Sequence, residues 1–183
     1  MKNNNLYLVI AIIVIAIFAR LIPHAPNFTP LLAVALFSGA LFSGNKLFYL
    51  IPVAALLVSD LFLGFSSITP VVYFSLGLIA VLGISLKKAT EKFNSKSIMS
   101  ITIKSFAAAV IFFIVSNMGV FLLTGMYPIS LAGLVECYTL AIPFFRNTLI
   151  STMAYSFSLF GLYAAVTKVV EPKKVKTKKA TAK

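Results

Sequence analysis

Apolar residues along the chain fall into seven runs, separated by short polar or proline-rich links. A helix needs about 20 apolar residues to cross the hydrocarbon layer of a bilayer, and about 17 are still workable. The runs are Leu6–Ala19, Leu31–Phe42, Leu47–Leu63, Pro70–Leu86, Ile101–Leu123, Leu131–Phe145 and Leu149–Val166. The first can be extended through Ile22, and the second is the shortest. This pattern predicts an all-α integral membrane protein.

The composition agrees with that prediction. Of the 183 residues, 60% are hydrophobic and 11% are charged, and the mean hydropathy is +1.02. A soluble domain of this size cannot bury so much apolar surface. Arg20 stands where a signal-peptide cleavage site needs small neutral residues, so we expect the first run to be retained as a span. We predict one transmembrane domain over residues 1–170 and a basic, disordered cytoplasmic tail over residues 171–183.

The lysines predict how the chain crosses the membrane, because cytoplasmic flanks are enriched in Lys and Arg. With the N-terminus inside, Lys46 and the lysines of residues 87–96 also lie inside. If Leu131–Phe145 crossed as well, the lysine-rich tail would lie outside, against this bias. We therefore predict six transmembrane helices, with Leu131–Phe145 as a short helix at the outer face and both termini cytoplasmic. The expected location is the bacterial cytoplasmic (inner) membrane.

The formal net charge of +12 does not predict nucleic-acid binding, because the lysines cluster beside apolar runs instead of covering a polar face. We expect the basic tail to contact anionic lipid of the bilayer. An arm that binds nucleic acid is the less favoured alternative.

Ionisable side chains are costly inside a bilayer, so the few near the spans are candidates for a site or a buried pair. Five of them map to the predicted outer side: Arg20, His24, Asp60, Glu136 and Arg146. One interpretation is two ion pairs that lock the outer ends of the helices, because buried charges are usually paired. The other is a polar cavity that opens to the outside and orients a solute. The two interpretations are compatible.

The segment RLIPHAPNFTP, residues 20–30, gathers unusual chemistry between the first two runs. It holds the one histidine of the chain and three of its eight prolines. Proline cannot continue a helix and forces its predecessor out of helical geometry, so the link is expected to be stiff and extended. Asn27 and Thr29 add hydrogen-bonding side chains, and Thr29 before Pro30 predicts an N-cap. The segment is either a rigid turn or a polar loop that contacts a ligand.

A second dense segment, residues 126–149, reads MYPISLAGLVECYTLAIPFFRNTL. Helical spacing puts Glu136 and Cys137 on or beside one face. Tyr138 and neighbouring aromatic residues suit an interfacial helix, and they equally suit a pocket wall that stacks on a flat ring. Asn147 and Thr148 are expected to cap the last span.

The sequence carries no catalytic or nucleotide-binding motif, so we expect no enzyme activity and no cofactor. Cys137 is most simply a small buried hydrophobe, and His24 a hydrogen-bonded wall residue. A transition metal held by these two side chains is a low-ranking alternative, because no ligand-spacing motif supports it.

Three segments carry a resemblance to a known family: RLIPHAPNFTPLLAVALFSGALF, IPVAALLVSDLFLG and YPISLAGLVECYTLAIPFFRNTL. They resemble an uncharacterised bacterial family of proposed transport proteins, which in turn is similar to the substrate-binding S-components of energy-coupling-factor (ECF) vitamin transporters. The resemblance implies a bundle of six membrane helices with a ligand pocket at the outer side, partly closed by the loop after the first helix. It also implies capture of a vitamin-like small molecule and partnership with an ECF coupling subunit and ATPases.

S-components that dock on a shared coupling subunit often carry an alanine pair at four-residue spacing in the first helix. Ala11, Ala16 and Ala19 do not make one, which puts docking on a standard module in doubt. The expected substrate-binding residues are Arg20, His24, Asn27, Thr29, Asp60, Glu136, Tyr138, Arg146 and Asn147. The alternatives to transport are a structural or assembly protein without a ligand and, less favoured, a lipid-modifying enzyme with Glu136 and His24 as acid and base.

Overall fold

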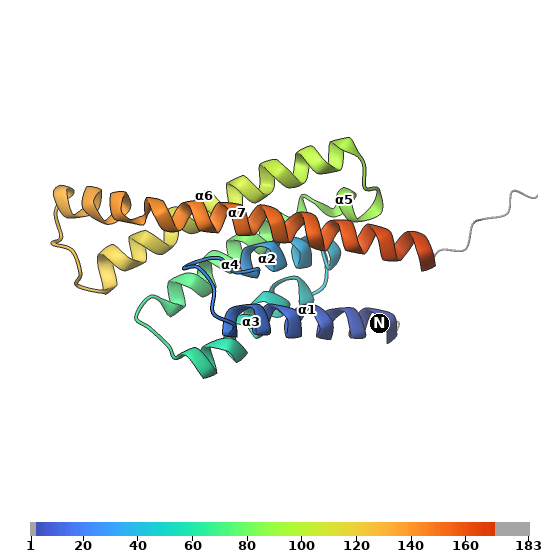
Figure 1. Cartoon of the computed structure of the whole chain (residues 1–183), viewed down its shortest axis with the longest axis horizontal. Helices are drawn as coiled ribbons and strands as arrows, with labels where there is room; N and C mark the ends of the chain where they lie inside the picture. Colours follow the sequence, from blue (N-terminus) through green and yellow to red (C-terminus); the bar gives the residue numbers. More distant parts are fainter. Residues whose placement is uncertain (1–2, 171–183) are drawn as a thin grey trace, which may run out of the picture.

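The computed structural model of the protein describes residues 3–170, and every regular element in that range is a helix (Figure 1). The helices are α1 Asn3–Leu21, α2 Leu31–Leu41, α3 Leu47–Leu63, α4 Thr69–Ile84, α5 Lys87–Glu91, α6 Ser95–Leu123 and α7 Leu131–Val170. The prediction of an all-α fold is confirmed, and α3 begins and ends at the predicted residues. The predicted tail, residues 171–183, lies outside the described residues.

Successive long helices run in opposite directions along the molecule. The links 22–30, 64–68 and 124–130 lie toward the left of Figure 1, which we call the loop end. The link 42–46 and the short helix α5 lie toward the right, which we call the lysine end because Lys46, Lys87, Lys88, Lys92 and Lys96 belong to its links and helix ends. Both ends of the described chain also lie at the lysine end.

Helix α2 is the centre of the bundle. Each of its first ten residues, Leu31–Ala40, is buried, and α2 contacts all six other helices. Phe37 packs edge-on against Phe160 of α7, with 5.1 Å between the ring centroids. An α-helix rises 1.5 Å per residue, so the 11 residues of α2 span only about 16 Å. The shortest apolar run is therefore a core helix enclosed by longer ones.

Glycines set the closest helix crossing, between α2 and α4. A Cβ added at Gly39 would lie 2.0 Å from the carbonyl oxygen of Ala80, and one at Gly83 would lie 2.3 Å from the carbonyl oxygen of Leu36. Small residues allow such close approach of two helix backbones. The crossing fixes α2 against α4 and so fixes the core around which the other helices pack.

The C-terminal apolar segments form one helix, not two. Residues 131–145 are continuous with residues 149–166 in α7, a helix of 40 residues that passes through Pro143. The prediction of a separate short helix at the outer face is wrong. Proline removes one backbone hydrogen bond, but the long contact between α6 and α7 keeps the helix on its path. The shortest helix among the described residues is α5, at the lysine end.

Two predicted caps are also wrong. The N-cap position of α2 is Pro30, one residue later than predicted, and no side chain caps this helix end. Asn147 and Thr148 lie inside α7, where the Thr148 hydroxyl donates to the carbonyl oxygen of Phe144 at 2.9 Å. Because α7 does not break between its two apolar runs, there is no helix end there to cap.

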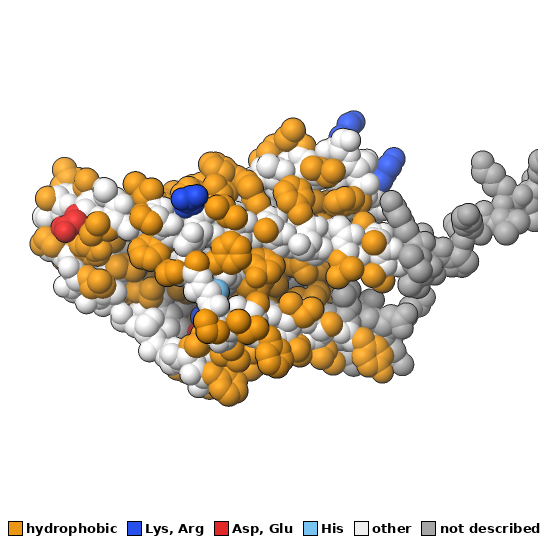
Figure 2. All heavy atoms as spheres, in the orientation of Figure 1, with side chains coloured by type: hydrophobic (Ala, Val, Ile, Leu, Met, Phe, Trp, Pro, Cys, Tyr) orange, Lys and Arg blue, Asp and Glu red, His pale blue; other side chains and the backbone are white. Residues whose placement is uncertain are grey.

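Among residues 3–170, two helices are long and apolar enough to cross a membrane by length and composition: α6, and α7 over Leu131–Thr167. Only 28% and 22% of their most apolar windows is buried inside the protein. The core helix of a soluble protein is mostly buried, whereas here the apolar side chains face outward, and hydrophobic side chains cover much of the visible surface (Figure 2). Such large exposed apolar surfaces mark contact with a membrane or a partner.

Candidate functional site

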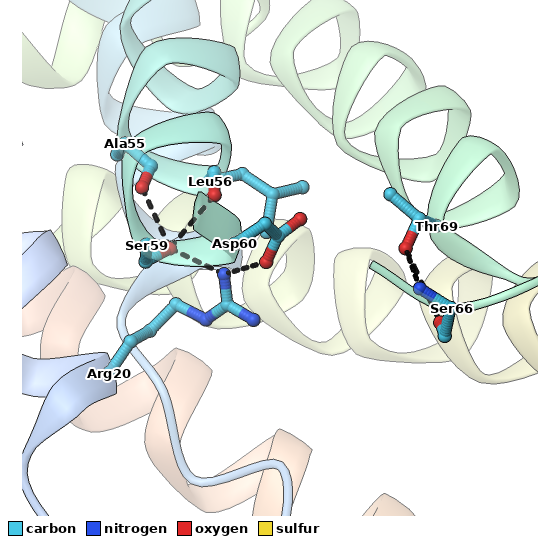
Figure 3. A network of polar contacts seen from close by, with 7 residues as sticks. All are labelled: Arg20, Ala55, Leu56, Ser59, Asp60, Ser66 and Thr69. Carbon is cyan, nitrogen blue, oxygen red and sulfur yellow. Dashed lines mark hydrogen bonds and ion pairs between the residues drawn. The ribbon is translucent and has the colours of Figure 1, made fainter. Parts of the chain in front are cut away.

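An ion pair at the loop end ties the first helix to the third. Arg20, in the last turn of α1, donates through Nη1 to Oδ1 of Asp60 at 2.7 Å and to Oγ of Ser59 at 2.5 Å (Figure 3). The Ser59 hydroxyl in turn lies 2.9 Å from the carbonyl oxygens of Ala55 and Leu56 in its own helix. The side chain of Asp60 is 7% exposed and that of Arg20 is 18% exposed. The cationic partner is therefore the more accessible of the two.

One of the two predicted ion pairs thus exists. Glu136 and Arg146 are both exposed and make no ion pair within residues 3–170. The ten residues between them correspond to about 15 Å of continuous helix, so the unbroken α7 keeps the two side chains apart. The interpretation as two ion pairs therefore holds for Arg20 with Asp60 and not for Glu136 with Arg146.

The link of residues 22–30 is folded onto α7. The Asn147 side-chain amide donates to the carbonyl oxygen of Pro26 at 3.0 Å, and the Ser151 hydroxyl lies 3.5 Å from the carbonyl oxygen of Asn27. Phe28 packs edge-on against Tyr155, with ring centroids 6.1 Å apart. Three consecutive residues of the link are therefore held by one helix.

Asn27 makes this path possible. Its φ of 61° lies in the left-handed region, which asparagine tolerates better than most residues. The reversal lets the Thr29 amide donate to the carbonyl oxygen of Asn27 at 3.1 Å. The link can then turn into α2 while Asn27 stays over the interior of the bundle.

Two adjoining cavities lie beneath this link. The first, which we call the aromatic cavity, has a volume of about 390 Å³ and is lined by Tyr127, Phe112, Phe113, Phe144 and Phe145, with polar groups from Asn27, Ser116, Asn117, Cys137 and Thr148. The second, the arginine cavity, has a volume of about 220 Å³ and is lined on its polar side by Arg20, His24, Asn27, Thr29, Thr148 and Ser151. Asn27, Val72, Phe112 and Thr148 line both, so the two cavities are neighbours with a shared wall.

The two cavities differ in the charge of their lining residues. No Asp, Glu, Lys or Arg side chain lines the aromatic cavity, whereas the arginine cavity is lined by Arg20 and His24. Asp60 does not line either cavity, because it is buried behind Arg20. A solute in the arginine cavity therefore meets the guanidinium and not the carboxylate.

Of the predicted site residues, Arg20, His24, Asn27 and Thr29 line the cavities, and Asp60 and Asn147 hold lining residues in place. Three others do not reach the cavities. Glu136 lines a separate shallow hollow on α7, and Arg146 is exposed and lines neither cavity. Tyr138 donates its hydroxyl to the carbonyl oxygen of Ile114 at 2.7 Å, which fixes α7 to α6.

The two residues of the suggested metal pair line different cavities. Cys137 is buried in the wall of the aromatic cavity, where its thiol lies 3.5 Å from the carbonyl oxygen of Asn117. His24 lines the arginine cavity, and its Nδ1 lies 2.7 Å from the carbonyl oxygen of Ile22. Residues 3–170 contain no cluster of three or more His, Cys, Asp or Glu side chains that could hold a metal ion.

Sequence reasoning missed the contribution of α6. Ser116 and Asn117 interrupt an otherwise apolar stretch, and both face the aromatic cavity together with Phe112 and Phe113. An amide inside a predicted span was the available signal, because polar groups at membrane depth usually face the interior of a bundle.

A known protein family matches nearly the whole chain. The model of a family of unknown function, DUF6580, matches residues 1–175. The chain belongs to the DUF6580 family. No curated protein and no solved structure matches it. For this DUF6580 chain, the arrangement of its own side chains is therefore the basis for a functional proposal.

Proposed function

We propose that this DUF6580 protein is a multi-pass protein of the bacterial cytoplasmic membrane that captures a vitamin-type small molecule from the outer side. In this proposal it serves as the substrate-binding subunit of a transporter, in the manner of an ECF S-component. Residues 22–30 cover the ligand, and the aromatic and arginine cavities bind it.

The proposed orientation rests on the distribution of charge. Five lysines belong to the lysine end, where both described chain ends also lie. The positive-inside rule puts that end in the cytoplasm and the loop end outside. The 40 residues of α7 span about 60 Å, roughly twice the hydrocarbon thickness, so α7 extends beyond the hydrocarbon layer.

The observation that carries the proposal is the pair of adjoining cavities beneath a tethered link. Ligand pockets are usually concave and mostly apolar, with volumes of about 300 to 1,000 Å³ and a few placed polar groups. The aromatic cavity alone measures about 390 Å³, and its amides come from Asn27 and Asn117. A flat ring packs between the phenylalanines there, and the amides orient it by hydrogen bonds.

A polar or acidic substituent of the same ligand extends into the arginine cavity. Arg20 uses Nη1 for both of its hydrogen bonds, to Ser59 and Asp60. A guanidinium has five N–H donors, so others are left for a solute. The buried Asp60 keeps the arginine in place while the cavity is empty.

Two other functions have less support. A structural or assembly protein without a ligand would be expected to fill the space below the loop end with side chains, and here that space is open. A lipid-modifying enzyme would need Glu136 and His24 close to one substrate. These residues line different hollows with no lining residue in common.

The test is native mass spectrometry of the gently purified protein, with one variant that fills the cavity and one matched control. Ala141 is buried in the wall of the aromatic cavity, whereas Ala154 is exposed on the same helix. We expect a small molecule of defined mass on the wild-type chain and on A154F, and at least a tenfold lower loaded fraction on A141F.

Equal loading of the two variants would show that the ligand binds elsewhere. Repeated preparations without a ligand, together with no binding of thiamine, riboflavin, biotin or cobalamin, would favour the ligand-free assembly function. Affinity purification of a tagged chain from its native membrane tests the transporter role, since a coupling subunit and ATPases are expected to be recovered with it.

A further inference from the structure

A basic hollow lies at the lysine end, at the corner between α5 and α6. It has a volume of about 410 Å³, and Lys88, Lys92 and Lys96 line it together with Glu91. Three lysines against one glutamate leave an excess of two positive charges. Ser85, Asn94, Ser97 and Ser100 add hydroxyl and amide groups. Like charges repel, so the gathering of three ammonium groups favours an anionic occupant.

The corner is held in shape by its own hydrogen bonds. The Asn94 side chain accepts from the Ser97 amide at 3.0 Å and caps α6, and the Ser97 hydroxyl donates to the carbonyl oxygen of Lys92. The Lys92 amide donates to the carbonyl oxygen of Lys88 at 3.0 Å. The backbones that carry the lysines are therefore fixed relative to one another before any anion binds.

An apolar stripe leads away from the hollow along α6. Lys96, Met99, Ile103 and Phe106 are spaced three, four and three residues apart, which places them along one side of a helix. The side chains of Met99, Ile103 and Phe106 are 62%, 55% and 50% exposed. A lysine from the hollow thus lies at one end of an exposed apolar stripe that runs along α6 away from the lysine end.

We propose that this corner binds an anionic phospholipid of the cytoplasmic leaflet, with the lipid phosphate in the basic hollow and an acyl chain along the apolar stripe. Basic pockets between membrane helices on the cytoplasmic side are suited to lipid head groups. The combination of charge and stripe selects a lipid over a free anion, because a free anion gains nothing from Met99, Ile103 and Phe106. In Figure 2, Lys and Arg side chains stand out over the region where α6 begins, beside hydrophobic surface.

The site is separate from the ligand cavities, which lie at the opposite end of the molecule and share no lining residue with it. Lipid binding can therefore be measured whether or not a small molecule is captured. Failure of one proposal leaves the other intact.

The experiment is native mass spectrometry in a neutral detergent, with titration of phosphatidylglycerol and of phosphatidylcholine as the uncharged comparison. The test variant is K88Q/K92Q. The matched control is K46Q/K87Q, because Lys46 and Lys87 belong to the same end and lose the same charge, but neither lines the hollow. Each lysine at a lipid contact is worth about 1 kcal/mol, or about fivefold in affinity.

We expect K88Q/K92Q to bind phosphatidylglycerol about 25-fold more weakly, and K46Q/K87Q to bind it like the wild type. Glu91→Gln removes the opposing charge from the hollow and is expected to tighten binding. Equal weakening by the two double variants, or equal binding of the two lipids by the wild type, would overturn the proposal.

The stripe is tested with a second pair of variants on α6. Ile103→Ser is expected to weaken long-chain phosphatidylglycerol and to leave the dihexanoyl form unchanged, and Ile98→Ser, at an exposed position on another face of α6 that does not line the hollow, is the control. Displacement of long-chain lipid by an equal concentration of inorganic phosphate would assign the hollow to a free anion and overturn the lipid assignment.

Discussion

The crossing of α2 and α4 offers a sharp test of the fold, because two glycines of the same helix should respond in opposite directions to alanine. A Cβ at Gly83 would lie 2.3 Å from the carbonyl oxygen of Leu36 and 2.9 Å from its Cα, both backbone atoms that no rotamer change can move. A Cβ at Gly77 meets nothing within 4 Å. Both glycines lie inside α4.

The expected change in the free energy of unfolding is the sum of a gain in helix propensity and a loss from overpacking. Alanine in place of a helical glycine is worth about 1 kcal/mol in helix propensity. Overpacking of a tight contact costs about 1 to 3 kcal/mol, and the upper end applies to Gly83 because α2 and α4 must move apart by about 1 Å. We expect G77A to stabilise the protein by about 1 kcal/mol and G83A to destabilise it by about 2 kcal/mol. At about 2 to 4 °C per kcal/mol, the midpoint rises by about 2–4 °C in G77A and falls by about 4–8 °C in G83A.

The midpoint of thermal unfolding can be measured through the native cysteine. Cys137 is the one cysteine of the sequence and is 2% exposed, so a thiol-reactive fluorogenic dye reports its exposure during thermal unfolding. No new label is needed, and neither glycine lies on α7. An equal rise of the midpoint in G83A and G77A would refute the close crossing of α2 and α4.

The same assay tests two further features. Asp60→Ala leaves the Arg20 guanidinium without its buried partner and is expected to lower the free energy of unfolding by about 3 kcal/mol. The double change Arg20→Met with Asp60→Leu removes both charges and is expected to leave the free energy of unfolding nearly unchanged. Equal losses of stability in the two variants would contradict a paired, buried site. Asn27→Gly keeps the left-handed backbone and should unfold like the wild type, while Asn27→Val is expected to cost about 1–2 kcal/mol. A valine variant as stable as the glycine variant would show that residue 27 does not hold that conformation.

Local features of the fold could be read from the sequence because they depend on neighbouring residues. The run Leu47–Leu63 became α3 with unchanged bounds, and the prolines of residues 23–30 kept that link out of a helix. Pro143 was misleading, since the sequence around it predicted two helices. Packing of α7 along α6 decided in favour of one helix, and that contact joins residues far apart in the chain.

The candidate site was only partly predictable for the same reason. Arg20, His24, Asn27 and Thr29 belong to one short segment, so their shared location could be foreseen. The wall supplied by α6 could not, because its polar members stand inside an apolar run whose orientation depends on the whole bundle. The position of Glu136 outside the two cavities could not be foreseen for a related reason, since the direction in which a side chain leaves a helix depends on which face of that helix is covered.

The sequence by itself determined the all-α class, the family and the positions of most helices. The length of an apolar run and the placement of prolines and charges limit where a helix can begin and end, and they do so without contacts to distant parts of the chain. The tertiary structure decided that the shortest apolar run is the buried centre, that Arg20 pairs with Asp60, and that a cavity lies under the first link. The buried position of α2 depends on the approach of helix backbones at Gly39 and Gly83. Close packing is a property of several helices at once, and no single stretch of the chain specifies it.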